Sequence, residues 1–160
     1  MLTGITFSSL IPGVCIDRLA KLEATEGTRR LIAPYAQLLD SHRYDESGQL
    51  FSEDAEFSVG PLTYRGRAEI QREICGMMRP EIATKHMLVQ PVIEFEGPTR
   101  ALAWTDMAGL ATDEAGIARA NLGRYHDRLV FEDERWRFAA RALLIAGDEL
   151  PAGVAESPGA

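Results

Sequence analysis

Between residues 86 and 145 the chain consists of long β-type segments separated by turn sequences of two to four residues. Turns this short join antiparallel neighbours, because parallel strands need a crossover of roughly a dozen residues or more. The second half of the chain therefore predicts an antiparallel meander. Its predicted strands are 86–95, 100–111, 117–131 and 135–145, and its turns are Gly97-Pro98, Asp113–Gly116 and Glu132–Glu134.

The first half of the chain predicts helices. In residues 23–43, Leu31, Tyr35 and Leu39 recur at four-residue spacing and form one apolar stripe, which Pro34 is expected to kink. Shorter segments complete this half: helices over 45–51 and 66–78, the second stopped by Pro80, and a strand over 55–59. Helices followed by a meander indicate an α+β domain. We expect a conical barrel of strongly curved, mixed and mostly antiparallel sheet, with the N-terminal helices packed over its concave face and a cavity at its open end.

One domain is expected in these 160 residues, over residues 23–147. Residues 1–22 predict an N-terminal extension. Residues 148–160, rich in Pro, Gly and Ala, predict a flexible C-terminal tail.

Charge and composition exclude several classes of partner. The net charge is −7 and no run of Lys or Arg offsets it, so we expect no nucleic acid. No apolar run is long enough to span a membrane. Two cysteines, Cys15 and Cys75, predict reduced thiols and a cytoplasmic location. The three histidines have no zinc spacing and no nucleotide-binding motif is present, so neither a metal nor an organic cofactor is expected.

Six motifs follow one another in an order that resembles a known family. They are Tyr35–Asp40, Leu50–Phe57, Tyr64–Gly66, the lone His86, Gly123–Asp127 and Trp136–Arg141. Over residues 24–146 this succession resembles the SnoaL-like branch of the nuclear transport factor 2-like superfamily, closest to the bile-acid 7α-dehydratase and scytalone dehydratase group. The resemblance implies self-association as a homodimer or homotrimer.

The resemblance also implies a set of catalytic residues. Dehydratases of this group use a tyrosine and an aspartate of the first long helix and a histidine of the sheet, which match Tyr35, Asp40 and His86. The bile-acid enzyme has a further acid and an arginine, and Asp106 and Arg141 stand in comparable places. The activity implied is that of a cofactor-independent dehydratase (a lyase) acting on a polycyclic, aromatic or steroid-like hydroxy ketone.

These residue types suit the elimination of water from a β-hydroxy ketone. A histidine such as His86 can take the C–H proton and return it to the leaving hydroxyl. A carboxylate such as Asp40 can orient the imidazole, Tyr35 can donate to the carbonyl, and Asp106 can serve as an auxiliary acid. The substrate-binding residues predicted around them are Arg141, Phe57, Met78, Leu88, Trp104 and Tyr125.

Strand alternation leaves some of these placements open. His86 and Leu88 share one face of a strand, whereas Ile93 and Phe95 fall on the other, and a bulge near Pro91 would bring all four to one face.

Two further placements are open for the same reason. Asp106 shares a face with Trp104, which puts it either in the cavity or in an ion pair with Arg141 or Arg124. Arg141 has the opposite parity to Trp136 and Phe138, which favours a structural ion pair. His126 is expected to face solvent or an interface.

Two other functions fit the same pattern. A polyketide cyclase or a ketosteroid-type isomerase would use the same C–H abstraction. A noncatalytic ligand-binding protein, or a β-type subunit of a ring-hydroxylating dioxygenase, would share the fold, and a cone filled by side chains would favour it.

Overall fold

The computed structural model describes residues 18–79, 82–112, 115–116 and 118–158. Expectations that concern Cys15 and Pro80 lie outside these residues.

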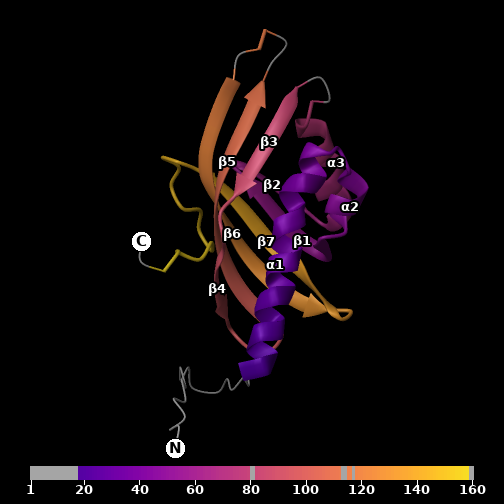
Figure 1. The fold of residues 1–160 in the computed structure, drawn as a ribbon, viewed down its shortest axis with the longest axis vertical. Coiled ribbons are helices and arrows are strands. Elements are labelled where there is room, and N and C mark those ends of the chain that lie inside the picture. The colour runs from indigo at the N-terminus through magenta and orange to yellow at the C-terminus, as the bar shows by residue number, and fades with distance from the viewer. Residues whose placement is uncertain (1–17, 80–81, 113–114, 117, 159–160) are drawn as a thin grey trace, which may run out of the picture.

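Three helices cover one side of a curved seven-stranded sheet, and the C-terminal segment lies on the other side (Figure 1). The helices are α1 (Arg18–Asp40), α2 (Tyr44–Gly48) and α3 (Arg67–Met77). The strands are β1 (Phe51–Val59), β2 (Leu62–Arg65), β3 (Ala83–Leu88), β4 (Val92–Phe95), β5 (Arg100–Thr112), β6 (Ala118–Glu132) and β7 (Arg135–Ile145). This confirms the predicted α+β class, with a sheet that does not close into a complete barrel.

The sheet has the strand order β2-β1-β7-β6-β5-β3, and β4 pairs with the same strand as β3. Strand β1 runs parallel to β7, and the other pairs are antiparallel. The predicted mixture of mostly antiparallel pairs is therefore confirmed. Strand β2 was not predicted, because its four residues lie next to the Gly60-Pro61 turn and show no clear alternation.

Two bulges decide which side chains face the helices. Leu88 pairs with Met107 and Val92 pairs with Trp104, so four steps along β3–β4 oppose three along β5. This extra residue confirms the bulge expected near Pro91 and divides the predicted 86–95 strand into β3 and β4.

The second bulge lies in β7. Arg128 pairs with Ala140 and Leu129 pairs with Phe138, so one residue of β7 is left over. That residue shifts the alternation, and Arg141 thereby comes to the same face as Phe138.

The core lies between α1, α3 and the inner face of the sheet. Leu31, Tyr35 and Leu39 of α1 are buried there, as the four-residue spacing predicts, and Ile70 and Ile74 are the buried residues of α3. Pro34 lies inside α1, which continues through it. The helix begins at Arg18, so residues 18–22 of the predicted extension belong to α1.

The C-terminal segment, predicted to be flexible, contacts the outer face of the sheet. The indole N–H of Trp104 donates to the Ala155 carbonyl at 3.1 Å, and Nδ1 of His126 lies 2.8 Å from the same oxygen. Arg124 donates to the Ser157 hydroxyl at 2.7 Å. This segment therefore covers part of His126, which is expected to face solvent or an interface.

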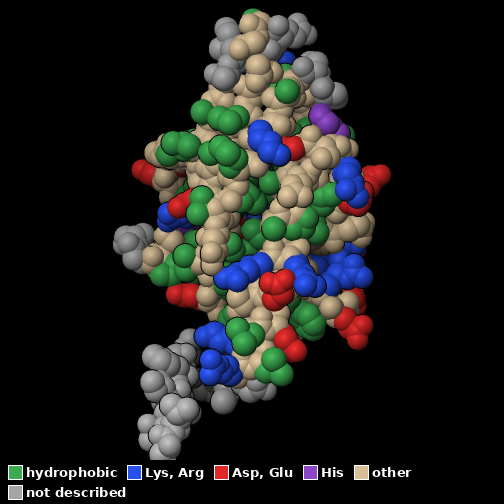
Figure 2. Space-filling view, in the orientation of Figure 1, with side chains coloured by type: hydrophobic (Ala, Val, Ile, Leu, Met, Phe, Trp, Pro, Cys, Tyr) green, Lys and Arg blue, Asp and Glu red, His purple; other side chains and the backbone are tan. Residues whose placement is uncertain are grey.

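Acidic and basic side chains are intermixed on the face shown in Figure 2 and do not form a patch of one sign. No helix among the residues that the structure describes is long and apolar enough to cross a bilayer.

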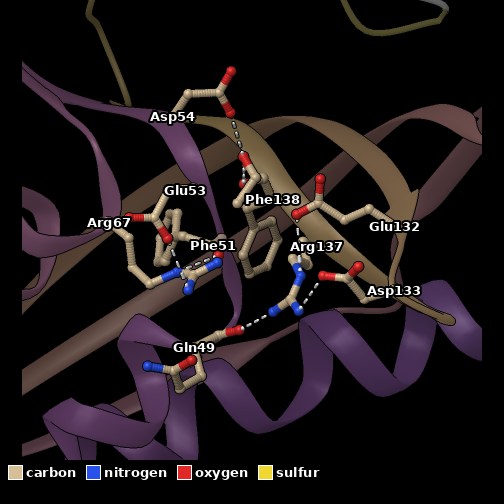
Figure 3. Close-up of polar contacts among 10 residues, drawn as sticks. Gln49, Phe51, Glu53, Asp54, Arg67, Glu132, Asp133, Arg137 and Phe138 are labelled. Carbon is tan, nitrogen blue, oxygen red and sulfur yellow. Dashed lines mark hydrogen bonds and ion pairs between the residues drawn. The ribbon is translucent and has the colours of Figure 1, made fainter.

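Two arginines hold the start of β1 through its backbone (Figure 3). Arg67 donates to the Phe51 carbonyl at 2.9 Å, and Arg137 donates to the Gln49 carbonyl at 3.0 Å. Arg137 is almost buried and also lies 3.1 Å from Glu132 and 3.4 Å from Asp133. These contacts fix the connection between α2 and β1 against the β6–β7 hairpin.

Gly123, in the predicted Gly123–Asp127 motif, is required by close backbone packing. A Cβ at this position would collide with the Leu144 carbonyl oxygen of the neighbouring strand. We expect Gly123→Ala to lower the free energy of unfolding by about 1–3 kcal/mol, because backbone cannot move aside as a side-chain end can. Urea denaturation followed by tryptophan fluorescence measures this change.

The matched control is Gly76→Ala in α3, where a Cβ would meet nothing within 4 Å. This substitution should raise stability by about 0.5–1 kcal/mol through helix propensity. Equal effects of the two substitutions would contradict the packing argument.

Candidate active site

Asp40, the last residue of α1, and His86 of β3 form a hydrogen-bonded pair. Asp40 Oδ1 lies 2.7 Å from Nδ1 of His86, and Oδ2 accepts the His86 backbone N–H at 2.9 Å. The side chains are 7% and 16% exposed, respectively. An ionised carboxylate only accepts hydrogen bonds, so Nδ1 carries the proton and Nε2 is left as the free basic nitrogen.

The carboxylate of Asp40 is held by three consecutive residues of β3. Besides its bonds to His86, the carboxylate accepts the Thr84 hydroxyl on Oδ1 at 3.4 Å, and Nζ of Lys85 lies 3.6 Å from Oδ2. These contacts fix the orientation of the Asp40 carboxylate.

Gly109 of β5 leaves room for the imidazole. It pairs with His86 across the sheet, and Nε2 lies 3.9 Å from the position that a Cβ on Gly109 would take. At this ordinary van der Waals distance, an alanine at position 109 would contact the ring without displacing it.

A second polar cluster lies deeper in the core around Arg141. This guanidinium makes two bonds of 2.8 Å to Asp127, and both side chains are fully buried. It lies 4.3, 4.2 and 3.8 Å from the ring centroids of Tyr35, Tyr125 and Phe138. One terminal nitrogen, Nη1, is buried without a hydrogen-bond partner among the described residues.

Burial shifts the acidities in this cluster. It raises the pKa of Tyr35 to about 12, with Arg141 opposing the rise. It raises the pKa of Tyr125 as well, to which the negative charges of Asp127 and Asp40 contribute. Both phenols are therefore neutral donors at physiological pH. Burial also raises the pKa of the Asp127 carboxyl, and Arg141 opposes this.

The structure thus joins two of the predicted catalytic residues by a direct hydrogen bond. Asp40 and His86 meet, whereas Tyr35 is packed beside Arg141 with 2% of its surface exposed. The structural ion pair favoured for Arg141 is present, with Asp127 as its partner, while a contact of Arg141 with substrate stays a prediction. Asp127 was missed, although it pairs directly with Arg141 across the β6–β7 hairpin.

The expected cavity positions of Asp106 and Trp104 are wrong. Their neighbours Ala103 and Met107 pack in the core, so Asp106 and Trp104 point to the outer face. Asp106 is 55% exposed and pairs with Arg124 at 2.5 Å, one of the two alternatives considered for it. Trp104 is buried there because the C-terminal segment covers it. Neither residue is retained in the site.

The other predicted substrate contacts lie on the inner side. Phe57 and Tyr125 are almost fully buried in the core, and Met78 and Leu88 pack against it partly exposed. The end of the cone around Phe51, Phe138 and Tyr35 is filled by their aromatic rings, which contact one another edge-on or tilted.

A groove of about 490 Å³ opens beside the pair, between α1 and the β3–β4 bulge, with His86 in its wall. A larger hollow of about 730 Å³ lies on the outer face, where its Asp106 and Arg124 neutralise each other. The groove is therefore the better candidate for chemistry. Among the described residues, no group of three or more His, Cys, Asp or Glu could hold a metal ion.

Several solved structures are similar to this chain over most of their length. A protein named putative scytalone dehydratase, from Novosphingobium aromaticivorans, has 24% identity, covers 88% of this chain and 100% of its own, and gives a TM-score of 0.72. An NTF2-like protein of the same organism has 25% identity, 82% and 88% coverage and a TM-score of 0.73. The hexachlorocyclohexane dehydrochlorinase LinA-type3 of Novosphingobium barchaimii has 18% identity, 89% and 99% coverage and a TM-score of 0.74.

A curved sheet with helices on its inner side places this chain in the class of nuclear transport factor 2-like proteins. Within that class, residues 20–142 match the model of the SnoaL-like domain, and the chain belongs to this family. The expected family resemblance is confirmed. No protein of curated function matches the chain.

Proposed function

We propose that the protein is a cofactor-independent lyase that removes water from a polycyclic, aromatic or steroid-like hydroxy ketone. The observation that carries this proposal is the 2.7 Å bond between Asp40 and Nδ1 of His86, in a pair that is mostly withdrawn from solvent. A histidine oriented by a carboxylate is suited to proton transfer near neutral pH.

The proposed step uses Nε2 of His86 as the base. It takes the proton from the carbon next to the carbonyl, and the electron pair of that C–H bond forms an enolate. When the enolate collapses, a C=C bond forms and the C–O bond to the hydroxyl breaks. The imidazolium returns its proton to the leaving hydroxide, which departs as water, and Asp40 stabilises the imidazolium in between.

The names of two structural neighbours support an elimination. A dehydratase removes the elements of water, and a dehydrochlorinase removes those of hydrogen chloride. Both reactions need a base at carbon and a route for the leaving group. These likenesses concern the fold, so the argument for this chain depends on its own Asp40 and His86.

A panel of hydroxy ketones with product mass as the readout tests the proposal. Turnover should give a product lighter by one water, whereas isomerisation or cyclisation without dehydration conserves mass. His86→Gln should lower the rate by about 10²–10⁴-fold, the usual range for one acid–base group. His42→Gln, at an exposed histidine that bonds Tyr44, is the matched control and should leave the rate unchanged.

Equal rates of the two variants on a true substrate would remove His86 from the mechanism. A product of unchanged mass that still depends on His86 would replace the dehydratase by the isomerase or cyclase alternative.

A noncatalytic ligand-binding or subunit role is the second candidate, and the packing of the cone favours it. Tyr35, Phe57 and Tyr125 are buried among core side chains, which reduces the space for a substrate at that end. Ligand binding without turnover across the panel, together with a larger copurifying subunit, would support this role.

A further inference from the structure

The groove beside His86 has an apolar body. Five side chains of α1 form one wall, and the β3–β4 region forms the other. The apolar lining residues are Ile32, Ala33, Ala36, Leu88, Val89 and Pro91. A volume of about 490 Å³ lies within the range of pockets that take drug-sized ligands.

The charges of this groove are of one sign. Arg29 and Lys85 are its charged lining residues, and no carboxylate stands among the described residues that line it. Nζ of Lys85 lies 3.6 Å from Oδ2 of Asp40, so this cation already has a carboxylate partner. Arg29 is exposed, and within the part of the chain that the model describes it has no hydrogen-bond or ion-pair partner.

This arrangement contrasts with the rest of the protein. The chain has a net charge of −7, and the arginine next in sequence, Arg30, is paired with Glu26 at 2.8 Å. An unpaired guanidinium at the rim of an apolar groove offers a site for an anionic group, because a guanidinium binds carboxylate or sulfonate oxygens through paired N–H donors.

We propose that this groove binds an amphipathic anion: a compact, rigid apolar body that carries one carboxylate, sulfonate or comparable group. The apolar body lies between α1 and the β3–β4 bulge, and the anionic group contacts Arg29. We take this anion to be the substrate on which His86 acts, and that part of the inference rests on the proposed function. The binding site itself does not.

Two fluorescent probes of nearly the same shape test the charge preference. 8-Anilinonaphthalene-1-sulfonate carries one sulfonate, and N-phenyl-1-naphthylamine has the same ring framework without it. The sulfonate probe should bind the native protein about 1.5- to fivefold more tightly, which is the range of an exposed charge pair. Raising the ionic strength from about 0.02 to about 0.5 M should remove most of this difference.

The variants Arg29→Gln and Arg30→Gln provide a matched pair. Arg29→Gln should weaken binding of the sulfonate probe by about the same 1.5- to fivefold and leave binding of the neutral probe unchanged. Arg30→Gln removes the same charge from a position outside the groove and should change neither. Equal effects of the two variants would overturn the proposal, since they would show a dependence on net charge only.

A third variant locates both probes. Ala33 is an exposed lining residue of α1, so Ala33→Trp fills the groove while the helix keeps its inner stripe. This variant should abolish binding of both probes, and undiminished binding would place them elsewhere and overturn the proposal. Circular dichroism checks that the variant is folded.

The outcomes separate this inference from the proposed function. Arg29-dependent binding without turnover of any hydroxy ketone would uphold the groove and reject the lyase. Turnover that depends on His86 but not on Arg29, for substrates with and without an anionic group, would uphold the lyase and reject the groove as its substrate site.

Discussion

Replacing Arg141 with methionine should lower the free energy of unfolding by about 3–5 kcal/mol, the cost of leaving one partner of a buried ion pair uncompensated. Asp127 would then remain in the core, without the two 2.8 Å bonds that Arg141 provides. Three aromatic rings pack against the same guanidinium, so the variant would also lose these contacts. Urea denaturation followed by circular dichroism measures the change.

The control for this prediction lies on the outer face of the same sheet. Arg124→Met breaks the exposed pair with Asp106 and should cost less than about 1 kcal/mol. The double variant Arg141→Met with Asp127→Leu removes both buried charges and should recover part of the loss. An Arg141→Met variant no less stable than Arg124→Met would show that the buried pair does not hold the core together.

Replacing Asp40 with asparagine should lower kcat of the proposed elimination by about 10³–10⁴-fold. The amide is nearly isosteric but is neutral, so it neither fixes the Nδ1–H tautomer nor stabilises the imidazolium. The measurement is the single-turnover rate on the substrate found by product mass, with circular dichroism to show that the variant is folded.

Asp45→Asn is the matched control for this substitution. Asp45 is an exposed acid of α2 that accepts a bond from Gln71, away from His86. Its variant should react at the native rate. An Asp40→Asn rate within tenfold of native would mean that His86 works without its carboxylate partner, or that the reaction uses other groups.

The elements of this fold follow from local patterns in the sequence. Strand β7 has the bounds that the pattern predicts, and the stripe of Leu31, Tyr35 and Leu39 is the buried face of α1. The bulge near Pro91 could be predicted because a proline cannot donate to the ladder and the apolar parity changes across it. The pairing of Asp40 with His86 could be predicted only from the family resemblance, because no spacing rule links residues 46 positions apart.

The errors come from tertiary contacts that alternation does not show. Trp104 lies on the outer face, where the C-terminal segment covers it. Strand alternation does not show this covering, so a large apolar residue at this position predicts an inward-facing side chain. The inner residues of β5 include Ala101 and Ala103, whose small side chains give a weaker signal. For Arg141, the extra residue in β7 brings the side chain to the inner face instead of the outer face. Strand β7 contains no proline or glycine that would have predicted this bulge.

The C-terminal segment has a consequence for assembly. It occupies the convex side of the sheet, with Ala155 and Ser157 using donors of Trp104 and Arg124 that an incoming molecule would otherwise find free. A second copy that docks on this area has to displace a peptide that is already present at very high local concentration. On this face, the protein's own C-terminal segment and a second copy of the chain would compete for the same surface. The outcome of this competition depends on protein concentration and on the length of the C-terminal segment.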